Sequence, residues 1–165
     1  MGNQHPLEID LAYLAGIIDG EGCITIHRTA QRRKNSDGKT LQPMLTITNC
    51  DSNIIARCQE ILNRLEINGH LKSSSIRRPS SWKTCYWFTV SGFKIKRILD
   101  AIKPYLVGKQ GQCELVLNFI NSRLSKGTPK AFPYDENEKE IVNQIHQLNQ
   151  RGSETERRPC SNASK

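Results

Sequence analysis

The segment LAYLAGIIDGEG (residues 11–22) constrains the fold of this chain more than any other stretch. It is apolar and rich in small residues, and it ends in two carboxylates, Asp19 and Glu21, that alternate with glycines. The pattern before the acids is helical, and Gly20 and Gly22 are of the type that ends a helix. The segment therefore predicts an N-terminal helix with acids at its C-terminal end.

The positive charge of the chain surrounds this acidic element. The net charge is +8 at pH 7, yet residues 1–22 contain no Lys or Arg. Basic residues gather downstream, in segments 28–39, 69–83 and 94–109. Such a charge balance favours a polyanionic partner, with nucleic acid ahead of an anionic membrane. An acidic element among basic segments is what a metal site facing a phosphate backbone needs.

Length and cysteine usage bound the class of protein. The 165 residues suit one domain, expected over residues 1–150, and polar residues 151–165 are expected to form a disordered tail. The six cysteines show no CxxC spacing and no histidine at zinc-ligand spacing, which indicates reduced thiols in an intracellular protein. No signal peptide and no apolar stretch of about 20 residues is found, so no membrane partner is expected.

Periodicity predicts an α+β fold. Alternating polarity indicates strands at 23–29 and 41–49, and Pro43 suggests an edge position or a bulge. Asp51 or Ser52 can cap the helix that follows. The remaining elements are two strands within 70–78 and 83–90, then helices with apolar residues at 95–102, 113–124 and 141–148. The order α-β-β-α-β-β-α followed by helices favours one antiparallel four-stranded sheet with helices on one face.

Two separated segments carry a family resemblance. LAGIIDGEG (14–22) resembles the signature of the LAGLIDADG homing endonucleases, DNA-cutting enzymes usually encoded within introns or inteins. PYLVGKQGQCELVLNFI (104–120) is similar to that family's Pro-Tyr-Leu…Lys…Gln segment, which leads into a helix. The resemblance spans roughly residues 8–148 and implies the homing-endonuclease fold with extra C-terminal helices.

The motif occurs once, and in the family a single-motif chain pairs its first helix with that of an identical chain. The resemblance therefore implies a homodimer with a two-fold axis. Small residues let helix backbones approach closely, although the same face also suits a helix packed on its own core. The expected dimer interface consists of Ala12, Ala15, Gly16 and Asp19. Asp19 is alternatively a residue that orients or caps the end of the helix.

The resemblance also implies a catalytic site. Glu21 occupies the position of the family's metal-binding acid, assisted by the carbonyl of Gly20, and hard cations such as Mg²⁺ take oxygen ligands of this kind. Mn²⁺ is expected to substitute, and Ca²⁺ to occupy the site without supporting cleavage. Lys109 matches the family's basic residue near the active site. A lysine exposed to solvent at the start of a helix would give the same sequence pattern. Asn49 matches a polar residue that positions the attacking water.

The outward face of the sheet is the expected DNA-reading surface, although the same pattern also fits a plain solvated face. The base-reading residues are Thr25, His27, Thr29, Gln42, Met44, Thr46, Lys72 and Ser74. The phosphate or flank contacts are Arg28, Arg32, Arg33, Lys34, Arg77 and Arg78. In the fourth strand either Lys83, Cys85 and Trp87 or Tyr86 and Phe88 face outward. The first is favoured, because Tyr86, Phe88 and Val90 form the better core stripe.

The resulting hypothesis is a Mg²⁺-dependent, intron-encoded endonuclease that makes a staggered double-strand break in a long pseudo-palindromic DNA site. The main alternative is a maturase on the same fold that binds intron RNA, since a basic sheet serves both polymers. Another is a catalytically inactive DNA-binding regulator, against which the intact Glu21 and Lys109 argue. The acidic motif argues against a structural ribosome-type protein, because nothing there needs carboxylates.

Overall fold

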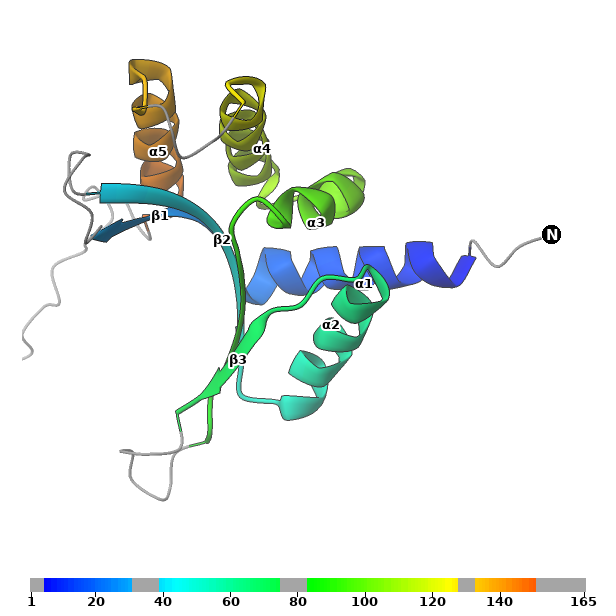
Figure 1. Ribbon diagram of the computed structural model, residues 1–165. Helices are drawn as coiled ribbons and strands as arrows, with labels where there is room; N and C mark the ends of the chain where they lie inside the picture. Colours follow the sequence, from blue (N-terminus) through cyan, green and yellow to red (C-terminus); the bar gives the residue numbers. More distant parts are fainter. Residues whose placement is uncertain (1–4, 31–38, 75–82, 128–132, 151–165) are drawn as a thin grey trace, which may run out of the picture.

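The described part of the chain folds into a curved antiparallel sheet with five α-helices on one side (Figure 1). This computed structural model describes residues 5–30, 39–74, 83–127 and 133–150. Its elements are α1 (His5–Glu21), β1 (Gly22–Ala30), β2 (Lys39–Asn49), α2 (Ser52–Arg64), β3 (His70–Ser73), β4 (Tyr86–Ser91), α3 (Ile95–Ile102), the 3₁₀ helix η1 (Lys103–Tyr105), α4 (Gln110–Ser125) and α5 (Glu136–Leu148). The sheet order is β1-β2-β4-β3 with antiparallel neighbours throughout. The predicted order of elements and the α+β fold are confirmed.

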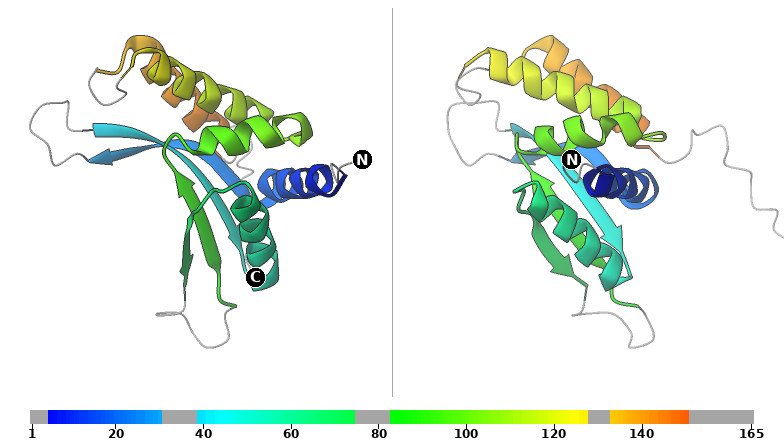
Figure 2. Two further views of the ribbon diagram at one scale, coloured as in Figure 1. Left: turned by 45° about the vertical axis from the view of Figure 1, so that its right-hand side comes forward. Right: turned by 90° about the vertical axis from the view of Figure 1, so that its right-hand side faces the viewer.

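The helices cover the convex side of the sheet and leave its concave side open (Figure 1). Helices α4 and α5 lie side by side and pack against β1, an edge strand of the sheet (Figure 2). In the described part of the chain no helix combines the length and apolarity that crossing a membrane requires.

The core lies between the sheet and the helices. Its strand residues are Ile24, Ile26, Leu45, Ile47, Phe88 and Val90, each at most 1% exposed. Burial of Phe88 and Val90 places Cys85 and Trp87 on the opposite face, as favoured from the sequence. Burying each such side chain stabilises the fold by about 1.5–3 kcal/mol.

Pro43 lies in β2, which is a central strand paired with both β1 and β4. The β1–β2 register runs without interruption from Gly22 opposite Ile47, so the expected bulge is wrong. The edge expectation is right only locally. Strand β4 ends opposite Met44, and the N–H of Gly92 donates to the carbonyl of Pro43 at 2.8 Å. The missing N–H of Pro43 therefore faces the point where β4 stops.

The C-terminal helices α4 and α5 bury two charged residues and expose the last apolar residue of each predicted segment. Leu124 and Leu148, the last residues of the apolar segments 113–124 and 141–148, are 46% and 51% exposed. Arg123 is buried instead and contacts Glu138, which is fully buried on α5. Helical spacing alone does not identify a buried ion pair, since each of its members is a charged residue of a type that usually faces solvent.

Gly22 joins α1 to β1, and the space there excludes a larger residue. A Cβ on Gly22 would lie 2.6 Å from the carbonyl oxygen and 2.7 Å from the Cα of Ile18. We expect Gly22→Ala to lower the free energy of unfolding by about 2 kcal/mol, because backbone atoms must move to admit the methyl group. Urea unfolding measures the loss. Gly20→Ala is the matched control, because no atom lies within 4 Å of its added Cβ. Equal urea midpoints for the two variants would contradict this account.

Candidate functional site

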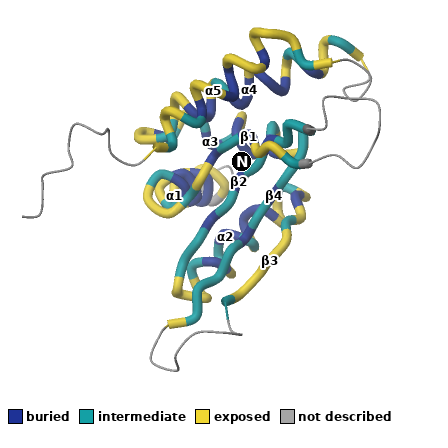
Figure 3. The backbone as a smooth tube through the Cα atoms, turned by 90° about the vertical axis from the view of Figure 1, so that its left-hand side faces the viewer, coloured by how far each residue is buried: buried dark blue, intermediate teal, exposed yellow. Residues whose placement is uncertain are grey.

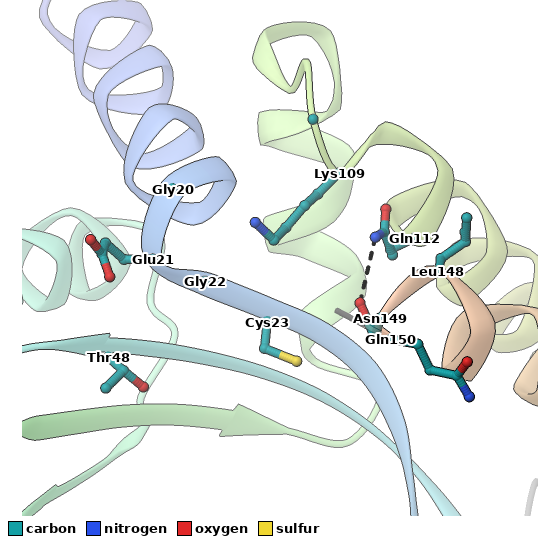
Figure 4. A pocket seen from close by; sticks show the side chains of 11 residues that line it. Gly20, Glu21, Gly22, Cys23, Thr48, Lys109, Gln112, Leu148, Asn149 and Gln150 are labelled. Carbon is teal, nitrogen blue, oxygen red and sulfur yellow. Dashed lines mark hydrogen bonds between the residues drawn. The ribbon is translucent and has the colours of Figure 1, made fainter. Parts of the chain in front are cut away.

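A pocket of about 490 Å³ lies where the end of α1 meets the start of α4 and the end of α5 (Figure 4). Its lining consists of Gly20, Glu21, Gly22, Cys23, Thr48, Gly108, Lys109, Gln112, Leu148, Asn149 and Gln150. Three residues singled out from the sequence thus line one pocket: the neighbours Gly20 and Glu21, and Lys109, almost 90 positions further along the chain.

Asp19 organises the approach to this pocket. Its two carboxylate oxygens accept hydrogen bonds from the backbone N–H of Val107 at 2.7 Å and of Lys109 at 2.9 Å. The ammonium of Lys109 donates in turn to the backbone carbonyl of Asp19. This carbonyl belongs to the last turn of α1, which is the negative end of the helix dipole. The carboxylate of Asp19 therefore holds the end of α1 to residues 107–109, as expected of a residue that orients the helix end, and its place in a dimer interface stays a prediction.

We expect Asp19→Ala to expose the loop that begins α4. The free energy of unfolding should fall by about 1–2 kcal/mol, because two backbone donors lose a charged acceptor. Hydrogen exchange should also quicken at the amides of Val107 and Lys109, and residue-resolved exchange measures this. Asp19→Asn, which keeps one acceptor oxygen, should give a smaller change. Unchanged exchange at both amides in Asp19→Ala would show that the carboxylate does not hold the loop.

Glu21 is exposed and is the acidic residue among those that line the pocket. Its side chain lies on the opposite side of the α1 end from the ammonium of Lys109 (Figure 4). In the described ranges no group of three or more His, Cys, Asp or Glu residues could hold a metal ion. A cation here would have the Glu21 carboxylate and the Gly20 carbonyl as protein ligands. Two oxygen donors fit a hard divalent ion that completes its shell with water or phosphate oxygens, and do not fit a metal held by protein alone.

Asn49 is not part of the pocket lining. Its side-chain oxygen accepts a hydrogen bond from the N–H of Asp51 at 2.8 Å, in the turn that leads into α2. Asp51 is the N-cap of that helix and accepts from the N–H of Asn53. Successive strand residues face opposite sides of a sheet, and Thr48 is the neighbour that reaches the pocket. Asn49 is thus next to the pocket residue Thr48 but is not among the lining residues, and its catalytic role stays a prediction.

Gln112 and Asn149 belong to the pocket and were not predicted. The amide of Gln112 donates to the side-chain oxygen of Asn149 at 3.4 Å, and Asn149 donates to the carbonyl of Ile24 at 2.9 Å. His146 contacts the carbonyl of Ile26 at 3.2 Å, so the end of α5 covers the open edge of β1. Gln112 lies three residues after Lys109, a spacing that places both on one helix face and could have indicated its role. Asn149 has no such local indication.

The open face of the sheet holds most of the residues predicted to read bases. Figure 3 looks at the sheet from this side and shows buried positions alternating with half-buried or exposed ones. In the β1–β2 register Thr25 lies opposite Met44 and His27 opposite Gln42, so these four side chains share the open face. Outward positions on the neighbouring strands continue the surface, among them Thr29, Thr46, Thr89, Lys72 and Trp87.

The other predicted DNA contacts do not all lie on the open face of the sheet. Arg28 lies on the helix-covered side of the sheet and donates to Asn143 on α5 at 2.9 Å. Ser74 is tied to Cys85, whose N–H donates to the Ser74 hydroxyl at 3.0 Å. Lys83 is exposed and precedes β4. The predicted contacts Arg32, Arg33, Lys34, Arg77 and Arg78, and the expected tail at 151–165, lie outside the described residues.

The exposed face of α1 is apolar. Ile9 is 62% exposed and Tyr13 39% exposed, and Ala12 and Gly16 are exposed on the same helix face, each three residues further along. Ala15 is fully buried in the protein's own core. Its expected place at a dimer interface is therefore wrong, because it lies on the helix face that packs against the sheet.

The model of a LAGLIDADG-like domain matches residues 8–103, which is more than half of the chain. No curated protein sequence matches this chain, whereas many solved structures do. The homing endonuclease I-CvuI, in complex with an I-CreI target in the presence of Mg and with its DNA not cleaved, is 22% identical, with 90% of this chain and 87% of that chain covered and a TM-score of 0.66.

Two further structures are similar. The archaeal intron-encoded homing endonuclease I-Vdi141I, complexed with DNA, is 18% identical over 88% of this chain and 87% of its own, with a TM-score of 0.62. The LAGLIDADG homing endonuclease I-GzeII, in complex with a DNA target, is 21% identical over 84% of this chain and 43% of its own, with a TM-score of 0.54. At these identities the similarity establishes a shared fold.

Proposed function

The chain belongs to the LAGLIDADG-like domain family, and from this premise we propose that it is a homing endonuclease that cuts both strands of a specific DNA site. One observation carries the proposal: Glu21, Gly20 and Lys109 line a single pocket at the end of α1. Thr48, which lies on the open face of the sheet, also lines this pocket, and the chain as a whole is basic. That the similar solved structures contain DNA favours DNA over intron RNA as the partner.

Two copies of the chain are proposed to act together, joined through α1. A double-strand break needs two sites, and each chain offers one such pocket. The exposed stripe of Ile9, Ala12, Tyr13 and Gly16 suits a second helix, because its small residues let the backbones approach closely and its larger ones add apolar area. A two-fold axis through this stripe would bring two Glu21 carboxylates to the centre of a pseudo-palindromic site.

The dimensions of the sheet suit such a site. Strand β2 has 11 residues, which span about 36 Å at roughly 3.3 Å per residue. This length covers about ten base pairs of duplex, so each sheet would follow one half-site in the major groove. Thr25, His27, Gln42 and Met44 would contact base edges there.

The chemistry is proposed to use a divalent ion held by the Glu21 carboxylate and the Gly20 carbonyl, with Mg²⁺ or Mn²⁺ as the supporting ion. Bound beside a phosphodiester, such an ion supplies Lewis acidity and neutralises charge on the leaving oxygen. Lys109 adds a fixed positive charge near the phosphate, which stabilises the more negative transition state. Asp19 holds residues 107–109 and so keeps Lys109 directed at the end of α1.

The proposal is tested by incubating the protein and Mg²⁺ with a library of duplex DNA that carries candidate intron-insertion sites. We expect cleavage at one long site with staggered ends, which sequencing of the products maps. Sedimentation of the same preparation should give a dimer. Absence of cleavage with Mg²⁺ or Mn²⁺, together with tight binding of intron RNA, would replace the endonuclease with the maturase alternative.

A further inference from the structure

Two cysteines face each other where β2 ends and β4 begins. The last pair of the β2–β4 ladder joins Asn49 to Tyr86, and the next opposing positions are Cys50 and Cys85. Their sulfur atoms lie 2.7 Å apart. Cysteines that oppose each other on neighbouring antiparallel strands have side chains on the same face, within reach of one another. The antiparallel register therefore brings together two thiols that lie 35 positions apart in the sequence.

The surroundings of this pair suit thiol chemistry. Cys50 is exposed and Cys85 is half-buried, so small reagents can reach both. Cys58 and Cys113 are fully buried, and burial raises the pKa of each thiol to about 11. Such buried thiols hold little of the reactive thiolate at neutral pH. Among these four described cysteines, reaction is thus directed to the pair at the sheet's end.

We propose that Cys50 and Cys85 are a modification site that forms a reversible disulfide when the chain meets a low-molecular-weight disulfide such as oxidised glutathione. One cysteine thiolate attacks a sulfur of the oxidant, forming a mixed disulfide and releasing one glutathione thiolate. The second cysteine then attacks the protein sulfur of the mixed disulfide and releases the other glutathione. Two protein thiols lose two protons and two electrons, and the oxidant becomes two thiols.

The bond would fasten one end of the sheet. Cys85 already anchors the start of β4 to β3, since its carbonyl accepts from the N–H of Ser74 at 2.9 Å and its N–H donates to the Ser74 hydroxyl. A link to Cys50 extends this anchor to β2, two residues beyond the pocket residue Thr48. The exposure of Cys50 leaves the bond open to reductants, which makes it a reversible link.

The test incubates the full chain with oxidised glutathione and maps disulfides by mass spectrometry of unreduced peptides. We expect one dominant product, an intramolecular Cys50–Cys85 link that dithiothreitol removes. The oxidised chain should melt about 5–10 °C higher, because the link closes a long loop in the unfolded state. The same link and shift should occur in Cys23→Ser and in Cys160→Ser, which remove the exposed pocket cysteine and the cysteine outside the described residues.

Cys50→Ser and Cys85→Ser should each lose both the link and the rise in melting temperature, and the remaining cysteine should carry a glutathione adduct. These variants change exposed or half-buried sulfur to oxygen, so they are expected to fold. The proposal would be overturned if the unaltered chain carried glutathione adducts alone. It would also be overturned if the chain formed several protein disulfides among which Cys50–Cys85 was not the main one.

Discussion

Glu21→Gln is expected to lose DNA cleavage by at least about 100-fold while retaining its affinity for the same DNA site. The amide has the size of the carboxylate but no charge, so it is a poor ligand for a hard divalent ion. Glu21 is the acidic residue among those that line the pocket, and its neighbour Gly20 can offer only a backbone carbonyl. Because Glu21 is exposed, its replacement should leave the fold and the open face of the sheet unchanged.

Cleavage is measured with a fixed duplex in Mg²⁺, and binding with the same duplex in Ca²⁺. Glu21→Asp is the first control and should keep most of the activity, since it retains the carboxylate. Glu8→Gln is the second, because Glu8 is an exposed acid in the first turn of the same helix and should have no effect. A Glu21→Gln protein that cuts as fast as the unaltered chain would remove Glu21 from the catalytic role.

Glu138→Gln is expected to cost about 3 kcal/mol of the free energy of unfolding. The Glu138 carboxylate is fully buried and accepts hydrogen bonds from Ser122 at 2.9 Å, Arg123 at 3.2 Å, Lys126 at 2.9 Å and the N–H of Asp135 at 3.1 Å. An amide satisfies some of these donors but removes the negative charge that faces the buried Arg123. Removing one member of a buried ion pair typically costs about 3–5 kcal/mol.

Urea unfolding at neutral pH measures this loss. Glu140→Gln is the matched control on the same helix, since Glu140 is exposed and accepts from Gln144 only one turn away. Its effect should stay within about 0.5 kcal/mol. Equal losses in the two variants would mean that the buried pair contributes nothing specific to stability.

Glu138 should also make the stability of the fold depend on pH. Burial alone would raise the pKa of Glu138, but hydrogen bonds from Lys126, Asp135 and Ser122 and the charge of Arg123 outweigh it and lower the pKa. A carboxyl with a lowered folded-state pKa stabilises the fold above its unfolded pKa, and this contribution is lost as the pH falls through the folded value.

The difference in stability between the unaltered chain and Glu138→Gln should therefore be largest above about pH 5 and shrink as the pH falls below about 4.3, the ordinary pKa of a glutamate. Urea unfolding of both proteins over this range measures the difference. A difference that grows on acidification would show that the sign is wrong.

Local spacing determined much of this protein. Alternating residues set the faces of β1 and β2, and the stripe of Phe88 and Val90 set the register of β4. Of the two predicted caps, Asp51 and Ser52, Asp51 is the N-cap of α2. These features depend on residues a few positions apart, so the sequence contains them in full. The LAGIIDGEG motif likewise pointed to the family, and PYLVGKQGQ pointed to Lys109.

Only the tertiary structure decided which residues meet. Ala15 packs inward rather than toward a partner, the Asn49 side chain is held in a turn outside the pocket, and Arg123 is buried. Asn149, which lines the pocket, donates to the carbonyl of Ile24, 125 positions earlier in the sequence. Cys50 at the end of one strand faces Cys85 at the start of another. Such contacts follow from how separate elements pack against each other. The periodicity within one element carries no information about which residue of another element lies next to it.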